Sequence, residues 1–572
     1  MTGRDATTAF AGALVDEWVR AGVTDAVIAP GSRSTPLALA LARHGRLRVH
    51  VVLDERSAAF RALGLGLASG RPAVLLCTSG TAAANFHPAV IEASHARVPL
   101  LVCTADRPPE LRDAGAGQTV DQSHLYGRAV RWFFDPGPPV DEPGAGAQWR
   151  ALASRAWAES LGPPAGPVHL NLPFREPLLP TGEPLVDAPG RVSGRPWTVS
   201  TPAVRAPRDT DVRHLADLVR ANPRGVVVAG WGAAVTPPTV QRFAAAAGWP
   251  VLADPLSQLR SGAQTISTYE ALLRVPGFGA AHRPDLVVRI GAPLTSKVAT
   301  SWLGPSVDQV LVDPDGSWLD PQHAAAERFA VDAEPLLAAV ALALGDSSLE
   351  PGPWPADWLA AEHSARAAID MTLDRAPGLG EGLVAREVAA ALPDGATLVV
   401  ASSVPVRALE WCMTPRTGLR VLANRGANGI DGFVSTVIGV AQATTPAPTV
   451  GLCGDLCFLH DINGLLGATG GASLVVLDND GGGIFSYLPP ADLPEFEPLF
   501  ATPHSLDLVE VARAHGAIAE RIDDLGRLTD ALQPANLASS DAVRVLVVPL
   551  DRDASVARHR ELWNAVARAT GG

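Results

Sequence analysis

The sequence is short of positive charge. Its 46 Lys and Arg residues are outnumbered by 59 Asp and Glu residues, and the formal net charge is -13 at pH 7. Binding to a nucleic-acid backbone requires a surplus of basic side chains, so this balance argues against a nucleic-acid-binding protein. Lysine is nearly absent, because Lys297 is the only one in 572 residues. Lys and Arg behave differently in pockets, so this single ammonium group is a candidate site residue, with biased codon usage as the alternative explanation.

Cysteine is scarce as well. Most cysteines lie in apolar runs such as AVLLCTSG and PLLVCTAD, which predicts reduced thiols in the protein core. Two of them are four positions apart, but no second Cys or His pair accompanies them at the spacing of zinc ligands, so we expect no zinc site. The five cysteines are Cys77, Cys103, Cys412, Cys453 and Cys457.

Long apolar runs are missing too. No stretch reaches the ~18 consecutive apolar residues of a membrane-spanning helix. The N-terminal segment TTAFAGALVDEWVRAGV has helical periodicity, but Asp16 and Glu17 interrupt it, and the apolar core of a signal peptide does not contain such charges. We therefore expect no membrane span and a cytoplasmic protein.

Glycine and proline are plentiful, with 54 and 50 residues, and they concentrate in two stretches around 180–207 and 345–358. Such stretches are typical of linkers. At ~150 residues per domain, the chain is long enough for three or four domains. We predict three, at residues 1–182, 205–345 and 356–572.

Each predicted domain alternates short apolar runs with amphipathic segments. The runs include DAVIAPG and PAVLLCTSG in the first domain, GVVVAGWG and PDLVVRIG in the second, and PTVGLCGD and ASLVVLDND in the third. Continuous runs of Val, Leu and Ile are typical of strands buried on both faces of a parallel sheet. The pattern predicts an α/β fold with three doubly wound parallel-sheet domains.

Polar residues follow two of the predicted strands in the last domain, where ligands of such sheets bind. Asp455 ends one run, and Asn479 ends another 24 positions later, followed by Gly481. If the strands are neighbours, a carboxylate, an amide oxygen and a backbone carbonyl form the oxygen shell that Mg²⁺ prefers. The alternative is that Asp455 and Asn479 only cap the helices that follow them.

Glu55 follows a strand-like run in the first domain and precedes an apolar helical segment. A carboxylate that caps this helix is the simpler interpretation of Glu55 alone. A partnership with the predicted metal site would give it a catalytic role instead.

The sequence resembles the thiamine-diphosphate-dependent enzymes. Asp455 and Asn479 resemble their metal-diphosphate motif, and Glu55 resembles their activating glutamate. The three predicted domains resemble the pyrimidine-binding, central and diphosphate-binding domains of the family. The closest resemblance is to the branch that acts in menaquinone biosynthesis. It is carried by APGSRSTPL at 29–37, TSGTAAANFHPAVIEA at 78–93, TADRPPELRDAGAGQ at 104–118, NRGANGIDG at 424–432 and DNDGGGIFSYLP at 478–489.

This resemblance implies thiamine diphosphate as cofactor, with Mg²⁺ or Mn²⁺, and Glu55 as the catalytic group that faces the aminopyrimidine ring. Ile430 resembles the apolar wedge under the cofactor, whereas Ile430 alone could equally be a core residue. Ile484 and Phe485 resemble apolar walls of the active site. The implied metal ligands are Asp455, Asn479 and Gly481. The implied cofactor-binding residues are Glu55, Thr78, Gly80, Gln118, Ser403, Ile430, Asp455, Leu456, Cys457, Asn479, Ile484 and Phe485.

The resemblance also implies a reaction. In this branch, 2-oxoglutarate loses carbon dioxide and the resulting carbanion adds to isochorismate. Both substrates carry two carboxylates, which bidentate arginines would orient. Each arginine taken alone would more simply be a solvated surface charge. The implied substrate-binding residues are Ser32, Arg33, Arg107, Gln118, Lys297, Ser403, Arg407 and Arg425, of which Arg407 and Arg425 best suit the distal carboxylate of 2-oxoglutarate.

Two positions depart from the family pattern. Val298 stands where some members carry a second basic residue, and Gly117 stands where asparagine is common. Substrate contacts from these positions are therefore not expected.

In the family, the residues that match Glu55 and Asp455 come from different subunits, which implies a homodimer or a homotetramer as the active assembly. The alternative enzyme is another thiamine-dependent 2-oxoacid decarboxylase or carboligase with an acetolactate synthase-like plan. A non-catalytic dinucleotide-binding protein is the alternative from another class. For that protein, GVVVAGWG lacks the full GxGxxG spacing.

Overall fold

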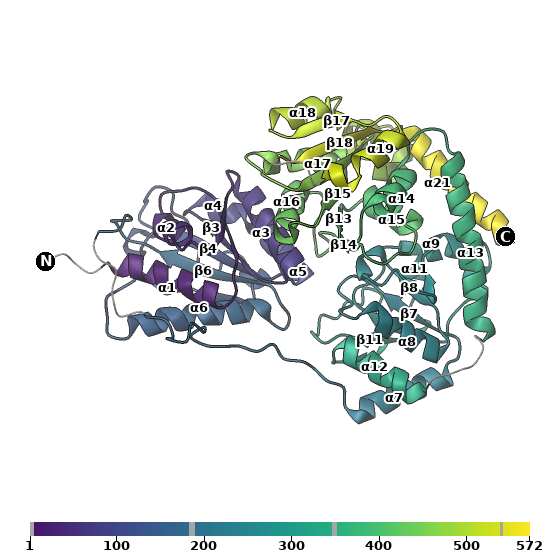
Figure 1. Ribbon diagram of the computed structural model, residues 1–572, viewed down its shortest axis with the longest axis horizontal. Helices are drawn as coiled ribbons and strands as arrows, with labels where there is room; N and C mark the ends of the chain where they lie inside the picture. The colour runs from purple at the N-terminus through teal and green to yellow at the C-terminus, as the bar shows by residue number, and fades with distance from the viewer. Residues whose placement is uncertain (1–4, 182–188, 346–351, 538–541, 572) are drawn as a thin grey trace.

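Three parallel sheets of six strands each organise the chain, as the computed structural model shows for residues 5–181, 189–345, 352–537 and 542–571 (Figure 1). Every strand pairing within them is parallel, and half of the strands are buried along their whole length. The predicted α/β fold with three parallel-sheet units is confirmed.

The first sheet has the strand order β2-β1-β3-β4-β6-β5. Its strands are β1 (Asp25–Ile28), β2 (Arg48–Val51), β3 (Ala73–Cys77), β4 (Leu100–Asp106), β5 (Trp132–Phe134) and β6 (Pro167–Pro173). Its helices are α1 (Ala6–Arg20), α2 (Thr35–Arg43), α3 (Glu55–Ser69), α4 (Thr81–Asn85), α5 (His87–Ala96) and α6 (Ala145–Leu161).

The central sheet has the order β12-β11-β10-β7-β8-β9. This corresponds to the 3-2-1-4-5-6 order of dinucleotide-binding folds when it is read from the other edge. Its strands are β7 (Gly225–Ala229), β8 (Val251–Ala253), β9 (Thr265–Ile266), β10 (Leu286–Ile290), β11 (Asp308–Val312) and β12 (Ala325–Phe329). Its helices are α7 (Asp209–Ala221), α8 (Pro237–Ala247), α9 (Tyr269–Arg274), α10 (Phe278–Ala281), α11 (Lys297–Trp302) and α12 (Ala333–Leu344).

The third sheet repeats the order of the first, as β14-β13-β15-β16-β18-β17. Its strands are β13 (Thr397–Val400), β14 (Arg420–Leu422), β15 (Thr449–Gly454), β16 (Ala472–Asp478), β17 (Ile518–Arg521) and β18 (Arg544–Pro549). Its helices are α13 (Pro353–Arg375), α14 (Glu381–Ala391), α15 (Val404–Cys412), α16 (Phe433–Thr444), α17 (Asp455–His460), α18 (Leu508–Ala514), α19 (Leu525–Ala531), α20 (Pro534–Leu537) and α21 (Arg552–Ala569).

The two predicted linkers differ in how well they match the structure. Residues 189–207 carry no helix or strand and run as a long connection between the first and central units (Figure 1). The second linker was predicted too long, because α13 begins at Pro353, inside the range 345–358. Proline is tolerated in the first turn of a helix, where its missing N–H has no intrahelical partner. Residues 182–188 and 346–351 of these linkers lie outside the described residues.

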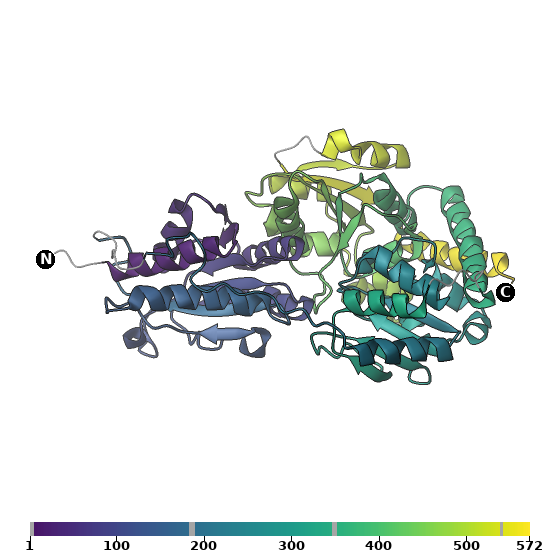
Figure 2. The same ribbon diagram turned by 60° about the horizontal axis from the view of Figure 1, so that its bottom comes forward.

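The third unit joins the other two. The first and central units lie at opposite ends of the molecule, and the third lies between and above them (Figure 1, Figure 2). The central and third units share one apolar cluster, in which Trp358 of α13 packs against Trp302 and Phe278 at ring distances of 5.9 and 5.2 Å. The central sheet is therefore tied to the third by a continuous core.

Helices α3 and α16 connect the first unit to the third. They approach so closely that a Cβ atom on Gly64 would lie 2.2 Å from the carbonyl oxygen of Thr436, and one on Gly439 would lie 2.2 Å from that of Arg61. Only glycine allows this separation, so the glycines bring the start of α3, with Glu55, against the third unit.

The expectations about cysteine and membrane spans can be compared with this fold. All five cysteines are buried and unpaired, as predicted. Of the helices that the structure describes, none combines the length and apolarity that crossing a bilayer requires.

Candidate active site

Asp455 lies where the sequence placed it, at the carboxyl end of β15 and beside the end of β16. The two strands are direct neighbours, with Gly454 opposite Leu477. Oδ2 of Asp455 accepts hydrogen bonds from the backbone N–H groups of Asn479 at 3.1 Å and Gly481 at 2.8 Å. The alternative that Asp455 serves only as a helix cap is wrong, because α17 is capped by Gly454 and the carboxylate faces the loop after β16.

The residues of this loop fit an oxygen-bound divalent cation. Oδ1 of Asn479 is buried and has no hydrogen-bond partner among the described residues. A buried amide oxygen without a partner is costly, and a cation would satisfy it. Gly481 has φ +137°, and a Cβ atom there would lie 2.2 Å from the carbonyl oxygen of Ala501, so no other residue fits. Burial raises the pKa of the Asp455 carboxyl, a cost that a bound cation would offset.

Sequence analysis missed two residues of this site. Oδ1 of Asp478 and Nε2 of His504 lie 3.7 Å apart, and the same His504 nitrogen lies 3.5 Å from Oδ2 of Asp455. Asp455, Asp478 and His504 each offer one potential ligand atom, and these three atoms all lie within 4.8 Å of one another. Asp478 could have been found from the sequence, because it is the last residue of β16 and directly precedes Asn479. His504 follows a stretch without regular patterning, so only the fold reveals it.

Glu55 is the first residue of α3, and its neighbour Asp54 caps the helix by accepting from the N–H groups of Arg56 and Ser57. Glu55 is therefore not needed as the capping carboxylate. The start of α3 contacts the end of α17, since Arg56 donates to the carbonyl oxygen of His460 at 2.6 Å. Glu55 and Asp455 share no hydrogen bond within the described part of the chain.

Three distant segments of the first unit converge near the predicted cofactor residues Thr78, Gly80 and Gln118. The backbone N–H of Arg33 donates to Oγ1 of Thr78 at 3.2 Å. Nε2 of Gln118 donates to the carbonyl oxygen of Ser79 at 3.0 Å, and the Gln118 side chain lies directly against Gly80. Gln118 is exposed, so its amide is accessible to a ligand.

Arg33 and Arg107 lie close together in this region. Arg33 is buried, so its interpretation as a solvated surface charge is wrong. It donates to the carbonyl oxygen of Phe174 at 2.9 Å and pairs with Glu176 at 3.0 Å. Burial and the nearby charge of Arg107 lower the pKa of the Arg33 guanidinium, as expected for two cations that share one site. Ser32, next to Arg33, is exposed.

Arg107 donates to the carbonyl oxygen of Gly117 at 3.0 Å. Gly117 thus contributes its backbone to this region, which any residue could do. The missing asparagine side chain at this position does not remove the contact to Arg107.

Arg407 and Arg425 form a second pair of cations, in the third unit. Arg407 donates to the carbonyl oxygen of Ser403 at 2.7 Å, and Arg425 is 3.4 Å from Oγ of Ser402. Burial and the charge of Arg425 lower the pKa of the Arg407 guanidinium. In the described part of the chain, neither arginine forms an ion pair with a carboxylate. Two adjacent cations without a partner are suited to an anionic ligand.

Lys297 is exposed at the first position of α11. The preceding residue, Ser296, donates its backbone N–H to Oε1 of the buried Glu410 at 3.0 Å. Glu410 lies one turn after Arg407 on α15. The start of α11, where Lys297 lies, is therefore hydrogen-bonded to α15, the helix that also carries Arg407.

The predicted apolar residues lie around the start of α17. Ile430 is 37% exposed, so its interpretation as a core residue is wrong. Its carbonyl oxygen accepts from the thiol of Cys457 at 3.3 Å, which places Ile430 beside the helix that Asp455 begins. Leu456 and Ile484 are partly buried. Phe485 follows the loop after β16 and packs against Phe500, with the ring centroids 5.7 Å apart.

Glu92 was also missed by sequence analysis. It lies in α5 of the first unit and is 1% exposed. Its carboxylate accepts three backbone N–H groups of the loop that carries Arg425 and Ile430, at 2.6–2.8 Å. Nothing in the sequence distinguishes Glu92 from other glutamates on amphipathic helices.

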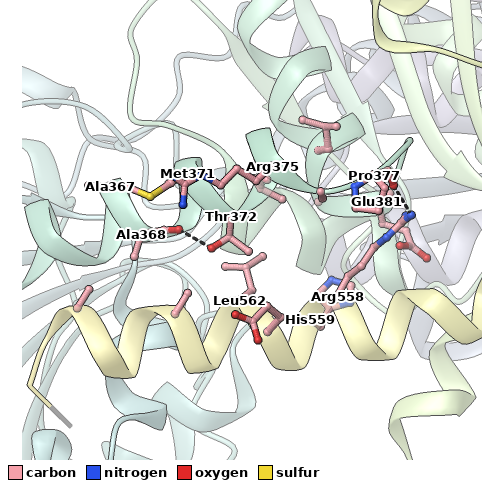
Figure 3. A pocket seen from close by; sticks show the side chains of 18 of the residues that line it. Ala367, Ala368, Met371, Thr372, Arg375, Pro377, Glu381, Arg558, His559 and Leu562 are labelled. Carbon is pink, nitrogen blue, oxygen red and sulfur yellow. Dashed lines mark hydrogen bonds between the residues drawn. The ribbon is translucent and has the colours of Figure 1, made fainter.

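Two cavities lie close to these elements. One of about 760 Å³ opens between the three units and is lined in part by Arg97, Arg420 and Arg425. Another, of about 820 Å³, lies between α13 and α21 (Figure 3). None of the predicted site residues lines this second cavity. His559, which lines this cavity, contacts the hydroxyl of Tyr487 at 2.5 Å. Tyr487 follows Ile484 and Phe485 closely in the sequence.

Two protein families match parts of this sequence. Residues 8–125 match the family "Thiamine pyrophosphate enzyme, N-terminal TPP binding domain". Residues 193–400 match the "Middle domain of thiamine pyrophosphate" family. Thiamine pyrophosphate is another name for thiamine diphosphate.

Solved structures show the same fold. The thiamine diphosphate-dependent 4-hydroxybenzoylformate decarboxylase of Rhodococcus jostii RHA1 is 17% identical, with a TM-score of 0.73 over 95% of this chain and 99% of that chain. The benzoylformate decarboxylase of Polynucleobacter necessarius is 19% identical, with a TM-score of 0.73 over 95% and 98% of the two chains.

Curated relatives match at much higher identity over the full length. The chain is 45% identical to 2-succinyl-5-enolpyruvyl-6-hydroxy-3-cyclohexene-1-carboxylate synthase of Thermobifida fusca, covering 98% of this chain and 99% of the relative. It is 43% identical to the protein of the same name from Chloroflexus aurantiacus, covering 99% and 97%. The chain therefore belongs to the 2-succinyl-5-enolpyruvyl-6-hydroxy-3-cyclohexene-1-carboxylate synthase family of thiamine pyrophosphate enzymes.

Proposed function

We propose that this protein is a transferase of menaquinone biosynthesis that removes carbon dioxide from 2-oxoglutarate and joins the remaining four-carbon unit to isochorismate. The product is 2-succinyl-5-enolpyruvyl-6-hydroxy-3-cyclohexene-1-carboxylate, after which its relatives are named. The observation that carries the proposal is the loop at Asp455, where the unpartnered amide oxygen of Asn479 lies next to a buried carboxylate. The full-length relatives favour this reaction over that of another 2-oxoacid decarboxylase or carboligase.

The cofactor of the proposed reaction is thiamine diphosphate with a divalent cation, for which Mg²⁺ is the first candidate and Mn²⁺ the second. Asp455, Asn479 and the carbonyl oxygen of Gly481 would hold the cation, because all three offer the hard oxygen ligands that it prefers. When bound, thiamine diphosphate would supply an acidic ring carbon that bonds to 2-oxoacids, in a positively charged ring that stabilises the electron pair released by decarboxylation.

Glu55 would exchange a proton with the pyrimidine ring nitrogen of the cofactor. Its position at the start of α3, with Asp54 already in the capping role, leaves its carboxylate available for this task. Ile430 would offer an apolar contact to the cofactor, since it is exposed beside α17. Ile484 and Phe485 would exclude water from the reacting atoms.

The substrates would be oriented by the two arginine pairs. Arg407 and Arg425 would bind the distal carboxylate of 2-oxoglutarate, because both are partly buried and neither has an acidic partner in the described chain. Arg33, Arg107 and Lys297 would bind the carboxylates of isochorismate. Ser32, Gln118 and Ser403 would contribute hydrogen bonds to these groups.

During the reaction, the bond between the keto carbon and the adjacent carboxylate carbon breaks and carbon dioxide leaves. This electron pair forms the new carbon–carbon bond to a ring carbon of isochorismate. A ring carbon–carbon double bond opens as the new bond forms, and the other carbon of that double bond takes up a proton. An apolar setting around the departing carboxylate favours its loss, because a neutral product replaces a charge.

The proposal extends to the assembly. We infer that residues 1–182 bind the pyrimidine ring, that 205–345 form the central domain, and that 356–572 bind the diphosphate. As in the family, Glu55 of one subunit and Asp455 of another would complete each site in a cytoplasmic homodimer or homotetramer. The start of α3 also contacts the end of α17 of its own chain.

A product assay tests the reaction. Purified protein with thiamine diphosphate, Mg²⁺ and 2-oxoglutarate is incubated with and without isochorismate, and carbon dioxide and the adduct are measured. We expect the adduct to form with isochorismate in amounts equal to the carbon dioxide. Release of succinic semialdehyde without an adduct would instead support the alternative decarboxylase.

Glu55→Gln tests the catalytic carboxylate. The variant should bind thiamine diphosphate nearly as well as the wild type but turn over ~10²-fold more slowly, because an amide cannot exchange the proton. Glu159→Gln, a change of a partly exposed side chain on α6, serves as the matched control and should keep full activity. A fully active Glu55→Gln variant would exclude Glu55 from the mechanism.

A further inference from the structure

The metal loop 478–483 rests against a second segment, residues 500–506. The backbone N–H of Gly482 donates to the carbonyl oxygen of Ala501 at 2.6 Å. The carboxylate of Asp480 accepts the backbone N–H groups of His504 at 2.9 Å and Ser505 at 2.7 Å. The two segments are thus tied together at both ends, with Gly481 packed directly on Ala501.

His504 is the one side chain of this second segment that is close to Asp455 among the described residues. Its side chain is 10% exposed, and Nδ1 accepts the backbone N–H of Leu506 at 3.0 Å. In a neutral imidazole, one nitrogen accepts and the other carries the hydrogen. Nε2 therefore carries an N–H, and this buried N–H has no hydrogen-bond partner among the described residues.

The N–H of His504 points between two carboxylates. Nε2 lies 3.5 Å from Oδ2 of Asp455 and 3.7 Å from Oδ1 of Asp478. On the other side of the ring, Nδ1 is 3.7 Å from Oδ1 of Asp480. Both Nε2 distances are longer than a hydrogen bond, so the N–H attracts the two carboxylates electrostatically without bonding to either.

The position of His504 affects which oxygen of Asp455 can bind a cation. Each carboxylate oxygen has two lone pairs. Oδ2 accepts two backbone N–H groups and faces His504, whereas Oδ1 accepts only that of Leu456, at 2.6 Å. Oδ1 therefore keeps a free lone pair. Polar partners of this kind orient metal ligands, and their removal commonly weakens metal binding by about 10–100-fold.

We propose that His504 is a positioning residue of the metal site, whose Nε2–H holds the carboxylates of Asp455 and Asp478 in place so that Asp455 and Asn479 can bind the divalent cation. This inference rests on the proposed metal and thiamine diphosphate site. It adds a residue outside the loop that supplies the ligands, from a segment without a recognisable motif.

Three variants separate the two ring nitrogens. His504→Gln keeps an amide N–H close to the place of Nε2, His504→Asn keeps a polar group close to the place of Nδ1 but loses the N–H at Nε2, and His504→Ala loses both. Ser505→Ala is the matched control, because the Ser505 side chain is exposed and its backbone contact to Asp480 remains.

The readout is the dissociation constant of Mg²⁺ in the presence of saturating thiamine diphosphate, measured by titration calorimetry, and that of Mn²⁺, measured by electron paramagnetic resonance. We expect about 10–100-fold weaker binding of both ions for His504→Asn and His504→Ala. His504→Gln and Ser505→Ala should stay within about threefold of the wild type. At saturating Mg²⁺, kcat of the weak binders should return to within about threefold of the wild-type value, while the KM for Mg²⁺ stays raised.

Each outcome decides between the hypotheses. If the wild type binds neither ion with thiamine diphosphate, the proposed function fails. If the wild type binds and His504→Asn and His504→Ala bind equally well, only the role of His504 is excluded. If His504→Gln loses Mn²⁺ far more than Mg²⁺, then His504 is itself a nitrogen ligand, which also overturns the positioning role. Thermal unfolding of the metal-free variants identifies any that fail to fold, and the Gln and Asn variants then replace Ala.

Discussion

The hydroxyl of Ser57 donates a hydrogen bond to Oδ1 of Asp461 over 3.1 Å, across 404 positions of sequence. Both residues are fully buried. Ser57 lies two positions after Glu55, and Asp461 directly follows the helix that Asp455 begins. The other carboxylate oxygen of Asp461 accepts the backbone N–H of Ser435 on α16 at 2.7 Å. Within one chain, Asp461 therefore joins α3 and α16 to the end of α17.

The coupling between Ser57 and Asp461 is measurable. Ser57→Ala and Asp461→Ala should each lower the free energy of unfolding, because each leaves a buried polar group without its partner. In a double-mutant cycle, the interaction energy should be about 1–2 kcal/mol. Urea unfolding followed by fluorescence gives the four values. Fully additive effects would show that the bond does not couple the two units.

Gly481→Ala tests the shape of the metal loop. The change forces a side chain into a backbone with φ +137° and places its Cβ 2.2 Å from the carbonyl oxygen of Ala501. The loop must shift, so we expect Mg²⁺ to bind at least about 10-fold more weakly in calorimetric titration.

Gly516→Ala is the matched control for this prediction. Gly516 also has a positive φ, +91°, but a Cβ atom there meets no atom within 4 Å. The control should lose about 1–3 kcal/mol of stability through backbone strain and leave Mg²⁺ binding unchanged. Equal metal affinities of the two variants would contradict the assigned role of Gly481.

The sequence allowed the fold and the placement of Asp455 beside Asn479 to be predicted, because both depend on local patterns. Apolar runs mark buried parallel strands, and the residues that follow neighbouring strands meet at one edge of the sheet. Asp455 and Asn479 were found in this way. Their pairing needed only the assumption that β15 and β16 are neighbours, which the structure confirms.

Glu92, Asp461 and His504 could not be predicted, because their roles come from contacts between distant segments. Glu92 looks like any charged residue of an amphipathic helix until α5 meets the loop of the third unit. His504 lies in a stretch without periodicity, and its partners are 24 to 49 positions away. Ile430 shows the opposite case, since its apolar character suggested the core equally well, and only the fold shows that it is exposed.

Glu92→Gln tests the contact between the first unit and the loop that carries Arg425 and Ile430. The amide has one acceptor oxygen, so its NH₂ group would face backbone N–H groups that now bind the carboxylate. Loss of these bonds should destabilise the protein by about 1–3 kcal/mol.

Under the proposed function, the freed loop should also raise the KM for 2-oxoglutarate by about 10-fold with a smaller change in kcat. Steady-state kinetics measures both constants. Glu110→Gln, which removes only an exposed ion pair to Arg175, is the control and should change neither. An unchanged KM in Glu92→Gln would separate Glu92 from substrate binding.

Glu410 predicts a pH dependence of stability. It is 1% exposed, and burial, together with the nearby carboxylates of Asp254 and Glu270, raises its pKa to about 8. The usual pKa of glutamate, about 4.3, applies to the unfolded chain. Between these values the folded protein holds a proton that the unfolded chain has released. The stability contributed by protonated Glu410 is therefore complete below the unfolded pKa and is lost as the pH rises through about 8.

Glu410→Gln removes this titration. The unfolding midpoint of the wild type, minus that of the variant, should fall steadily between pH 5 and pH 9, whereas effects common to both proteins cancel. Tyr269→Phe provides a second measurement, since the Tyr269 hydroxyl donates to Glu410 at 2.6 Å and this bond lowers the carboxyl pKa. Without that bond, the pKa of the Glu410 carboxyl rises further. The decline in the difference between the two midpoints should therefore extend to higher pH. Parallel curves for the wild type and Glu410→Gln would show that the Glu410 carboxyl binds protons equally in the folded and unfolded chain, and would exclude it as the source of the pH dependence.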